Sequence, residues 1–141
     1  METRKQGLDP EFRPKLDAFE RRLREVGIRV KLVCGCRSIE EQNRLYALGR
    51  TKPGRRVTNA RGGYSWHNFG LAADYAFVVG GQLTWSGPWN IFGRIARECG
   101  LEWGGDWKKF PDKPHVQWRR GRTLREMREG SARRASARSP L

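Results

Sequence analysis

The chain has only two histidines, His67 and His115, and each is followed or preceded closely by an aspartate. Asp74 falls inside the apolar run 71–79, where a buried carboxylate is costly unless it is paired or bound to a metal. Asp112 precedes His115 by three residues, on the approach to a predicted strand. Two imidazoles and one carboxylate are a known ligand set for catalytic zinc, which keeps a fourth position for water. The spacing therefore raises the hypothesis of a catalytic zinc site.

A structural interpretation of the same residues stays open on spacing alone. The two histidines are then a capped loop residue and a strand-end residue, and Asp74 pairs with one of the many arginines. Asp112 is then a turn residue before Pro114. The sequence contains no His-Glu-x-x-His, which excludes the helix-borne zinc peptidase motif.

The three cysteines, Cys34, Cys36 and Cys99, are too few and odd in number for a disulfide framework. A Cys-x-Cys pair with one distant cysteine also matches poorly the Cys-x2-Cys spacing usual in structural zinc sites. We interpret them as small buried apolar residues in a reducing compartment.

Longer motifs surround the candidate ligands. The chain reads Ser65-x-His67-x-x-Gly70-x-Ala72-x-Asp74, later Asp112-x-x-His115, and upstream Gly35-x-Arg37-Ser38-x-x-x-Gln42. In this order, over roughly 16–118, the motifs resemble the zinc peptidases of the D-alanyl-D-alanine carboxypeptidase superfamily. They are most similar to its phage endolysin branch, which cuts the L-alanyl-D-glutamate bond of peptidoglycan. The carboxypeptidase and dipeptidase branches show Glu-x-x-His with Trp before the His, so the Asp-Lys-Pro-His found here favours the endolysin branch.

The resemblance implies a role for each matched residue. Its zinc ligands are His67, Asp74 and His115, and Asp112 is the general base. Arg37 steadies the substrate carbonyl and its developing oxyanion. Residues expected to support the site or to contact substrate are Ser65, in the ligand loop, Gln42, in the upstream motif, and Asp106, for which a turn role is the alternative.

These residue types make a coherent hydrolytic site. Zinc lowers the pKa of its bound water towards about 7, a carboxylate accepts the proton and later passes it to the leaving amine, and a fixed cation stabilises the charge of the transition state. The function implied is a peptidoglycan-degrading zinc endopeptidase acting on the stem peptide. The alternative within the same fold is a D-alanyl-D-alanine carboxypeptidase.

The elements that must position these residues follow from apolar periodicity. Helices are predicted from Asp9-Pro10 to Gly27, over 38–48 and over 88–98, and strands over 28–34, 71–79, 82–85, 101–103 and 115–118. A long loop is predicted over 50–66. The pattern is α+β, a single small domain with helices packed on a mostly antiparallel sheet. We expect a flexible lead-in (1–8), a peptidase domain (9–118) and a flexible Arg-rich tail (119–141).

The net charge of +14 over 141 residues predicts an anionic partner. A basic nucleic-acid-binding protein would show this charge with interleaved Trp and Arg. No zinc-finger, RNP or helix-turn-helix signature supports that alternative, and we expect no nucleic-acid partner. For the peptidase, the basic tail is expected to attract the enzyme to the anionic bacterial envelope.

Location follows from two expected absences. No apolar run approaches the roughly 20 residues of a membrane span, and residues 1–7 are too polar to open a signal peptide. We therefore expect a monomer that accumulates in the host cytoplasm and acts, after release, on peptidoglycan in the periplasm or cell wall.

Overall fold

The structure, a computed structural model, describes residues 5–130, in which helices pack on an antiparallel sheet. The elements in chain order are α1 (Phe12–Glu25), β1 (Val30–Cys34), α2 (Ile39–Ala47), η2 (Trp66–Phe69), β2 (Ala72–Val79), β3 (Gln82–Thr84), α3 (Trp89–Glu98), β4 (Glu102–Trp103), η3 (Gly104–Asp106) and β5 (His115–Gln117). The predicted α+β class is confirmed, and each predicted strand is present with its ends shifted by at most two residues.

Strand β2 is the centre of the sheet. The strand order is β1-β2-β5-β4, with β3 paired to β2, and every pairing is antiparallel. Gly80 and Gly81 join β2 to β3 with φ of 59° and 79°. A two-residue hairpin of type I′ needs positive φ at both positions, which glycine adopts without strain. The predicted hairpin is thus confirmed.

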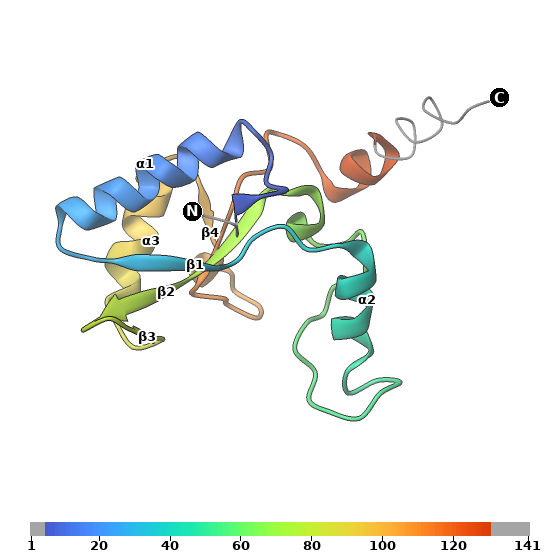
Figure 1. Ribbon diagram of the computed structural model, residues 1–141. Helices are drawn as coiled ribbons and strands as arrows, with labels where there is room; N and C mark the ends of the chain where they lie inside the picture. Colours follow the sequence, from blue (N-terminus) through green and yellow to red (C-terminus); the bar gives the residue numbers. More distant parts are fainter. Residues whose placement is uncertain (1–4, 131–141) are drawn as a thin grey trace.

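The core lies between the sheet and the helices α1 and α3, which cover one of its faces (Figure 1). Phe19 of α1 packs edge-on against Tyr75 of β2 and Phe92 of α3, with ring centroids 5.7 and 5.0 Å apart. Leu16 and Leu23, at helical spacing from Phe19, are fully buried. Helix α2 and the long segment after it extend away from this core (Figure 1).

The described part of the expected lead-in is packed rather than flexible. Leu8 is 5% exposed and belongs to the core, and the Lys5 ammonium lies 2.6 Å from Asp17 and 3.1 Å from Glu20 of α1. Gly70, at φ 70°, approaches this segment so closely that a Cβ would lie 2.6 Å from the Gly7 carbonyl oxygen. The expectation is therefore corrected for residues 5–8, while 1–4 lie outside the described residues.

The described part of the expected tail also packs on the domain. Residues 124–130 are helical, and Thr123 and Glu126 form a reciprocal capping box at its start. Leu124 and Met127 pack against the core. The expectation of a flexible tail is corrected for 119–130, and 131–141 lie outside the described residues. No helix in 5–130 has the length and apolar character needed to cross a bilayer.

Candidate active site

The register of the sheet brings three chemically active side chains to one face. Asp74 on β2 is paired with Cys34 of β1 on one side and with His115 of β5 on the other. Residues directly opposite each other in a sheet point to the same face. Tyr75, the next residue of β2, points to α1 and bonds Glu20, so Asp74 points to the opposite face. Sheet pairing alone therefore places Asp74 beside His115.

His67 reaches this face from the 3-10 turn η2. Ser65 caps the turn through its Oγ, which accepts from the His67 N–H at 3.2 Å, and Asn68 Oδ1 accepts from the Ser65 N–H. Asn68 Nδ2 also donates to the Arg37 carbonyl oxygen at 2.9 Å. Gly70 ends the turn in the left-handed conformation. This local network fixes the backbone from which the imidazole projects.

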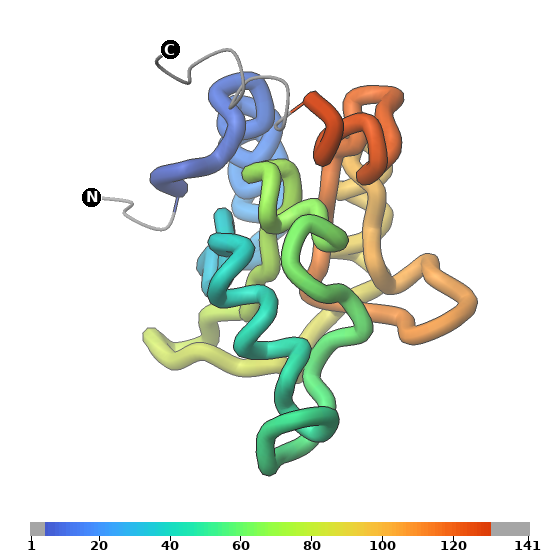
Figure 2. The backbone as a smooth tube through the Cα atoms, turned by 90° about the vertical axis from the view of Figure 1, so that its right-hand side faces the viewer, coloured from blue at the N-terminus to red at the C-terminus, as the bar shows by residue number. Residues whose placement is uncertain are grey.

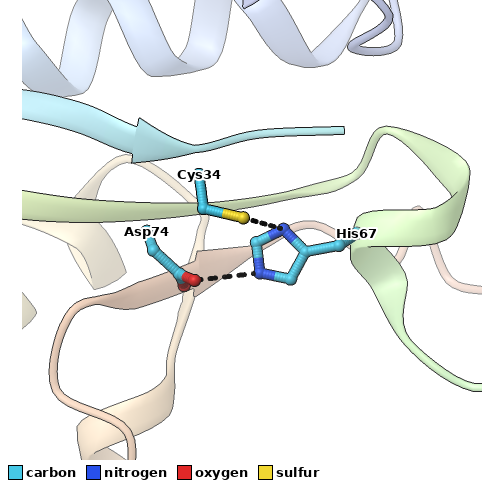
Figure 3. A group of neighbouring side chains, drawn as sticks. All are labelled: Cys34, His67 and Asp74. Carbon is cyan, nitrogen blue, oxygen red and sulfur yellow. Dashed lines mark hydrogen bonds and ion pairs between the residues drawn. The ribbon is translucent and has the colours of Figure 1, made fainter. Parts of the chain in front are cut away.

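The three predicted zinc ligands converge. His67 Nε2 lies 3.3 Å from Asp74 Oδ2, and His115 Nδ1 lies 3.0 Å from Asp74 Oδ1. The two imidazole centroids are 5.1 Å apart. Two overlapping groups in the described chain have ligand atoms close enough to hold a metal ion, Cys34–His67–Asp74 and Asp74–Asp112–His115, and they share Asp74. Figure 3 shows His67 between Cys34 and the Asp74 carboxylate.

The contacts behind the histidines leave the right nitrogens free for a metal. His67 Nδ1 donates to the Gly35 carbonyl oxygen at 2.7 Å, so Nε2 is the nitrogen that faces Asp74. Both histidines are buried, at 3% and 5% exposure. Two buried imidazoles, each with a nitrogen facing an oxygen of the same carboxylate, match the donor set of catalytic zinc. The residues present therefore fit a zinc ion.

A buried amide sets the tautomer of His115. Gln117 Nε2 donates to Glu102 Oε2 at 3.1 Å, and because a carboxylate only accepts, the amide must present Oε1 to His115 Nε2, 2.6 Å away. His115 Nε2 then carries a proton, and Nδ1 is the nitrogen that faces Asp74 Oδ1. We call the hydrogen-bonded chain His115–Gln117–Glu102 the relay. Arg119 and Trp107 hold its far end by bonding Glu102.

This relay predicts an effect on metal affinity. Gln117→Leu removes the acceptor at His115 Nε2, and we expect zinc affinity to fall by about 10–100-fold, the usual cost of losing such a supporting bond. Competition with a fluorescent chelator measures it. Glu102→Gln, which keeps an oxygen able to accept from Gln117, is the control and should lose less than Gln117→Leu. Equal affinity in the Gln117→Leu protein and the unchanged protein would contradict the relay.

Asp112 lies at the edge of the same site. Its Oδ2 is 3.9 Å from His115 Nδ1, and its side chain is 47% exposed to the cleft. The Asp112 N–H donates to the Gly104 carbonyl oxygen at 2.9 Å, and a Cβ on Gly104 would stand only 2.3 Å from the Asp112 carbonyl oxygen. Only glycine lets the 107–114 loop fold this close to η3. Asp112 is thereby held beside the ligands rather than in open solvent.

Arg37 and Gln42 form a second supported unit. Arg37 Nη1 donates to Gln42 Oε1 at 2.7 Å, and Nη2 lies 3.1 Å from the Cys34 sulfur. Gln42 is fully buried and donates in turn to the Ala60 carbonyl oxygen at 2.6 Å. The Arg37 guanidinium thus lines the cleft in a fixed position, and Gln42 ties it to the loop that forms one wall.

The candidate ligands open into a cleft of about 900 Å³, within the roughly 300–1,000 Å³ typical of ligand sites. Its walls come from the 50–66 segment and the 107–112 loop, which Figure 2 draws in green and orange. Three cationic residues line it, Arg37, Arg56 and Lys109, together with the exposed apolar side chains Val57 and Phe110. Of the loop arginines, Arg56 lines the cleft while its Nε donates to the Gly49 carbonyl oxygen at 3.3 Å, and Arg50 bonds backbone oxygens of Tyr46 and Thr58.

The charges of the site shift its pKa values in opposite directions. Burial by itself lowers the pKa of His67, but the bond and charge of Asp74 outweigh it and raise the pKa to about 10. Burial raises the pKa of Asp74, and the two histidines overcome this and hold it well below its usual range. Burial, and then the negative charge of Asp74, raises the pKa of Asp112. Without a bound metal ion, His67 therefore carries a proton.

That proton predicts pH-dependent metal binding. Because His67 is protonated below about pH 10 in the metal-free site, a metal ion must displace a proton to bind, and affinity should rise about tenfold per pH unit between pH 6.5 and 8.5. Zinc titrations against a chelator across this range measure the slope. Calorimetry in two buffers of different ionisation enthalpy counts the protons released. A pH-independent dissociation constant would contradict the proton's presence.

The structure does not bring Asp106 to the site. Both of its carboxylate oxygens pair with Arg97 of α3, at 3.0 and 2.9 Å, and it does not line the cleft. The expected role behind the ligands is thus corrected, and the turn alternative holds. Trp107, by contrast, packs on His115 with centroids 5.1 Å apart.

The interpretation of the cysteines as buried apolar residues is also corrected. Cys36 is exposed and Cys34 only partly buried, with its sulfur 4.0 Å from His67 Nδ1 (Figure 3). Burial raises the pKa of the Cys34 thiol, but the bond to His67 and the Arg37 charge lower it overall. The period of two along β1 already placed Cys34 on one face, but only the register showed that this is the face of Asp74.

Several supporting residues were missed by sequence reasoning: Gln117, Glu102, Asn68 and the Gly35 carbonyl. The spacing His115-x-Gln117 was a usable signal, because alternate residues of a strand share a face. Glu102 gave no such signal, since it reaches the site only through the β4–β5 pairing with Gln117.

Comparison with known proteins places this geometry among cell-wall peptidases. Two family models described as D-alanyl-D-alanine carboxypeptidase match residues 5–86 and 58–118. The Bacillus subtilis peptidoglycan L-alanyl-D-glutamate endopeptidase CwlK is 41% identical over 121 residues, covering 78% of this chain and 72% of its own. The L-alanyl-D-glutamate peptidase of Listeria phage A118 is 34% identical over 83 residues, covering 52% of this chain and 29% of its own.

A solved structure gives the same picture of the fold. The Serratia marcescens L-Ala D-Glu endopeptidase ChiX superposes with a TM-score of 0.59 at 26% identity, covering 90% of this chain and 92% of that one.

Proposed function

Because the chain belongs to the D-alanyl-D-alanine carboxypeptidase family, in its L-alanyl-D-glutamate peptidase branch, we propose that it hydrolyses the L-alanyl-D-glutamate amide of peptidoglycan stem peptides. The family's enzymes are metal-dependent peptidases, and the chain is one of them. The observation that carries the proposal is the convergence of His67, Asp74 and His115 in a cleft, with Asp112 at its edge. The choice of this amide bond rests on CwlK and the Listeria phage A118 peptidase, whose names both specify L-alanyl-D-glutamate.

Zinc is the metal proposed, held by His67 Nε2, Asp74 and His115 Nδ1. A bound zinc ion supplies Lewis acidity, which lowers the pKa of a water molecule and polarises a carbonyl group. Asp112 takes the proton of the attacking water and passes it to the leaving amine. Its raised pKa suits this exchange, because a base works best when its pKa lies nearer the working pH.

Arg37 is proposed to stabilise the developing oxyanion. Its guanidinium is already held by Gln42 and Cys34, so little reorganisation is needed when charge develops on the substrate. The cationic lining also suits the substrate: D-glutamate is joined onward through its side chain and keeps a free α-carboxylate next to the scissile amide. Arg56 and Lys109 lie on the cleft walls where such a carboxylate can pair.

The experiment is mass spectrometry of purified peptidoglycan digested by the protein with and without a zinc chelator. New free amines on glutamate, lost on chelation and restored by zinc, are the expected result. Release of D-alanine instead would move the enzyme to the second candidate, a D-alanyl-D-alanine carboxypeptidase, which the description of the matching family models favours. Absence of any cleavage by zinc-loaded protein would refute both.

An endolysin role is proposed as well, with the protein made in a host cytoplasm and acting on the wall after release. Likeness to a phage peptidase and the net charge of +14 support it. The attraction to an anionic envelope is assigned to the basic tail 119–141, whose last segment, 131–141, contains Arg133, Arg134 and Arg138. The proposed partner of this segment is the polyanionic bacterial envelope.

Deleting 131–141 tests the segment. Cleavage of a soluble stem peptide should stay within about twofold, while binding to intact envelopes at low salt should weaken and the difference should vanish at high salt. A full-length variant with the three arginines replaced by glutamine is the matched control, and it should behave like the deletion. Unchanged envelope binding by both variants would remove the role assigned to this charge.

A further inference from the structure

A second hollow lies beside the catalytic cleft and shares a wall with it. Its volume is about 370 Å³, and it is lined by Trp85, Trp89, Pro111, Asp112, Lys113 and Pro114. Pro111 and Asp112 also line the cleft that holds the candidate ligands. In Figure 2 the yellow segment after β3 runs towards the base of the orange loop, and residues of both segments line the hollow.

An indole platform forms one side of this hollow. Trp85 follows β3 and is 58% exposed, although tryptophan is the largest side chain and is usually well buried. Trp89 is anchored below it: its ring lies 4.3 Å from that of Phe77, and its Nε1 donates to the Trp85 carbonyl oxygen at 2.8 Å. The Trp85 backbone is thus held while its ring stays open to a ligand.

We propose that this hollow is a saccharide subsite, which binds the N-acetylmuramic acid ring that carries the stem peptide. The inference rests on the proposed function and specifies what the enzyme recognises beyond the peptide. In peptidoglycan the amine of the stem L-alanine is joined to the lactyl group of this sugar. Only the alanine and the lactyl unit therefore separate the scissile carbonyl from the ring, a reach of about 7 Å for two extended units.

That short tether decides where the sugar must lie. The carbonyl under attack has to lie beside the ligands, so the ring has to rest against a surface that begins within about 7 Å of them. Asp112 satisfies this condition, because its carboxylate is 3.9 Å from His115 Nδ1 and it also lines the hollow. The hollow and the cleft thus meet at Pro111 and Asp112, which line both.

The chemistry of the lining matches a pyranose ring. The C–H face of a sugar is apolar and packs flat on an indole, while its hydroxyl and N-acetyl groups need a few polar partners. Trp85 offers the flat apolar surface, Pro111 and Pro114 bound it, and the exposed Lys113 supplies a donor at the rim. A peptide side chain could pack on the same apolar surface, but it would not be held there by the short alanine–lactyl connection to the scissile carbonyl.

The test compares two substrates that share one peptide: the stem peptide with an acetylated L-alanine, and the same peptide on N-acetylmuramic acid. We expect the zinc-loaded enzyme to favour the sugar-bearing substrate in kcat/KM by roughly tenfold. Trp85→Ala should abolish this preference through KM and leave kcat on the acetylated peptide within about twofold. Leu83→Ala, 53% exposed on the same hairpin but outside the hollow, should keep the preference.

Three results would overturn the subsite: no preference in the unchanged enzyme, equal losses on both substrates in Trp85→Ala, or the same loss in Leu83→Ala. Equal losses would assign the hollow to the peptide instead. If neither substrate is cut, the proposed function fails and binding decides the subsite. Saturation-transfer NMR with the disaccharide GlcNAc–MurNAc then gives ring-proton signals with the unchanged protein and Leu83→Ala, and none with Trp85→Ala. The absence of signals with the unchanged protein refutes the subsite.

Discussion

We expect Asp112→Asn to lower kcat on a stem-peptide substrate by about 10²–10⁴-fold, with the proposed zinc ion still bound. The substitution changes little in size but replaces the basic carboxylate with an amide that does not take up a proton, and this range is what a positioned general base contributes. Asp112 lies at the edge of the proposed ligand set, 3.9 Å from His115 Nδ1, so we expect the metal to remain bound without its charge. Single-turnover kinetics and elemental analysis of the same sample measure the two quantities.

The matched control is Asp106→Asn. It makes the same chemical change at an aspartate that pairs with Arg97 outside the cleft, and we expect turnover to stay within about twofold of the unchanged enzyme. Two results would contradict the assignment of the base: turnover retained by Asp112→Asn, or zinc lost from it. The second would make Asp112 a ligand, which the grouping of Asp74, Asp112 and His115 allows chemically.

We expect Asp74→Asn to remove both the proposed metal and the activity. The carboxylate lies between the two imidazoles, at 3.3 and 3.0 Å, and is the only negative charge among the three proposed ligands. A neutral amide in its place weakens a zinc site by far more than the loss of a supporting bond, which costs about 10–100-fold. We expect less than one tenth of an equivalent of zinc after dialysis and cleavage at background level.

Thermal unfolding separates loss of metal from loss of fold. In the unchanged protein a chelator should lower Tm, because a ligand that binds only the folded state stabilises it. In Asp74→Asn the chelator should have no effect, and Tm should lie near that of the chelated unchanged protein. Asp112→Asn is the control that keeps the chelator response. A chelator-sensitive Tm in Asp74→Asn would show that the metal is held elsewhere.

Asp74 and Asp112 show how much of the candidate site can be predicted from the sequence. Asp74 was found because a carboxylate inside the apolar run 71–79 needs a partner, and His67 and His115 because no other histidines exist. The hairpin at Gly80-Gly81 and the helix over Leu16, Phe19 and Leu23 followed from turn chemistry and period. These are local rules, and the structure confirms the elements that they predict.

These local rules could not predict contacts between segments that are distant in the sequence. Asp106 and Asp112 both precede the last strand in a glycine- and lysine-rich loop, and composition treats them alike. The close approach of Gly104 to the Asp112 carbonyl turns one of them into the cleft, and the ion pair with Arg97 of α3 holds the other outside it. Likewise the sequence predicted a flexible lead-in over 1–8, and only the tertiary structure showed that Lys5 pairs with Asp17 of α1 and that Leu8 belongs to the core.

The sequence by itself determined the ligand types, their order and the strands and turns that carry them, because these depend on residue chemistry and on periods of a few residues. The tertiary structure alone decided which face of β2 is the reactive one, that Cys34 shares it, and that Gln117 and Glu102 fix the His115 tautomer. Those facts depend on strand register, and register is set by packing of the whole sheet against α1 and α3 rather than by any segment alone.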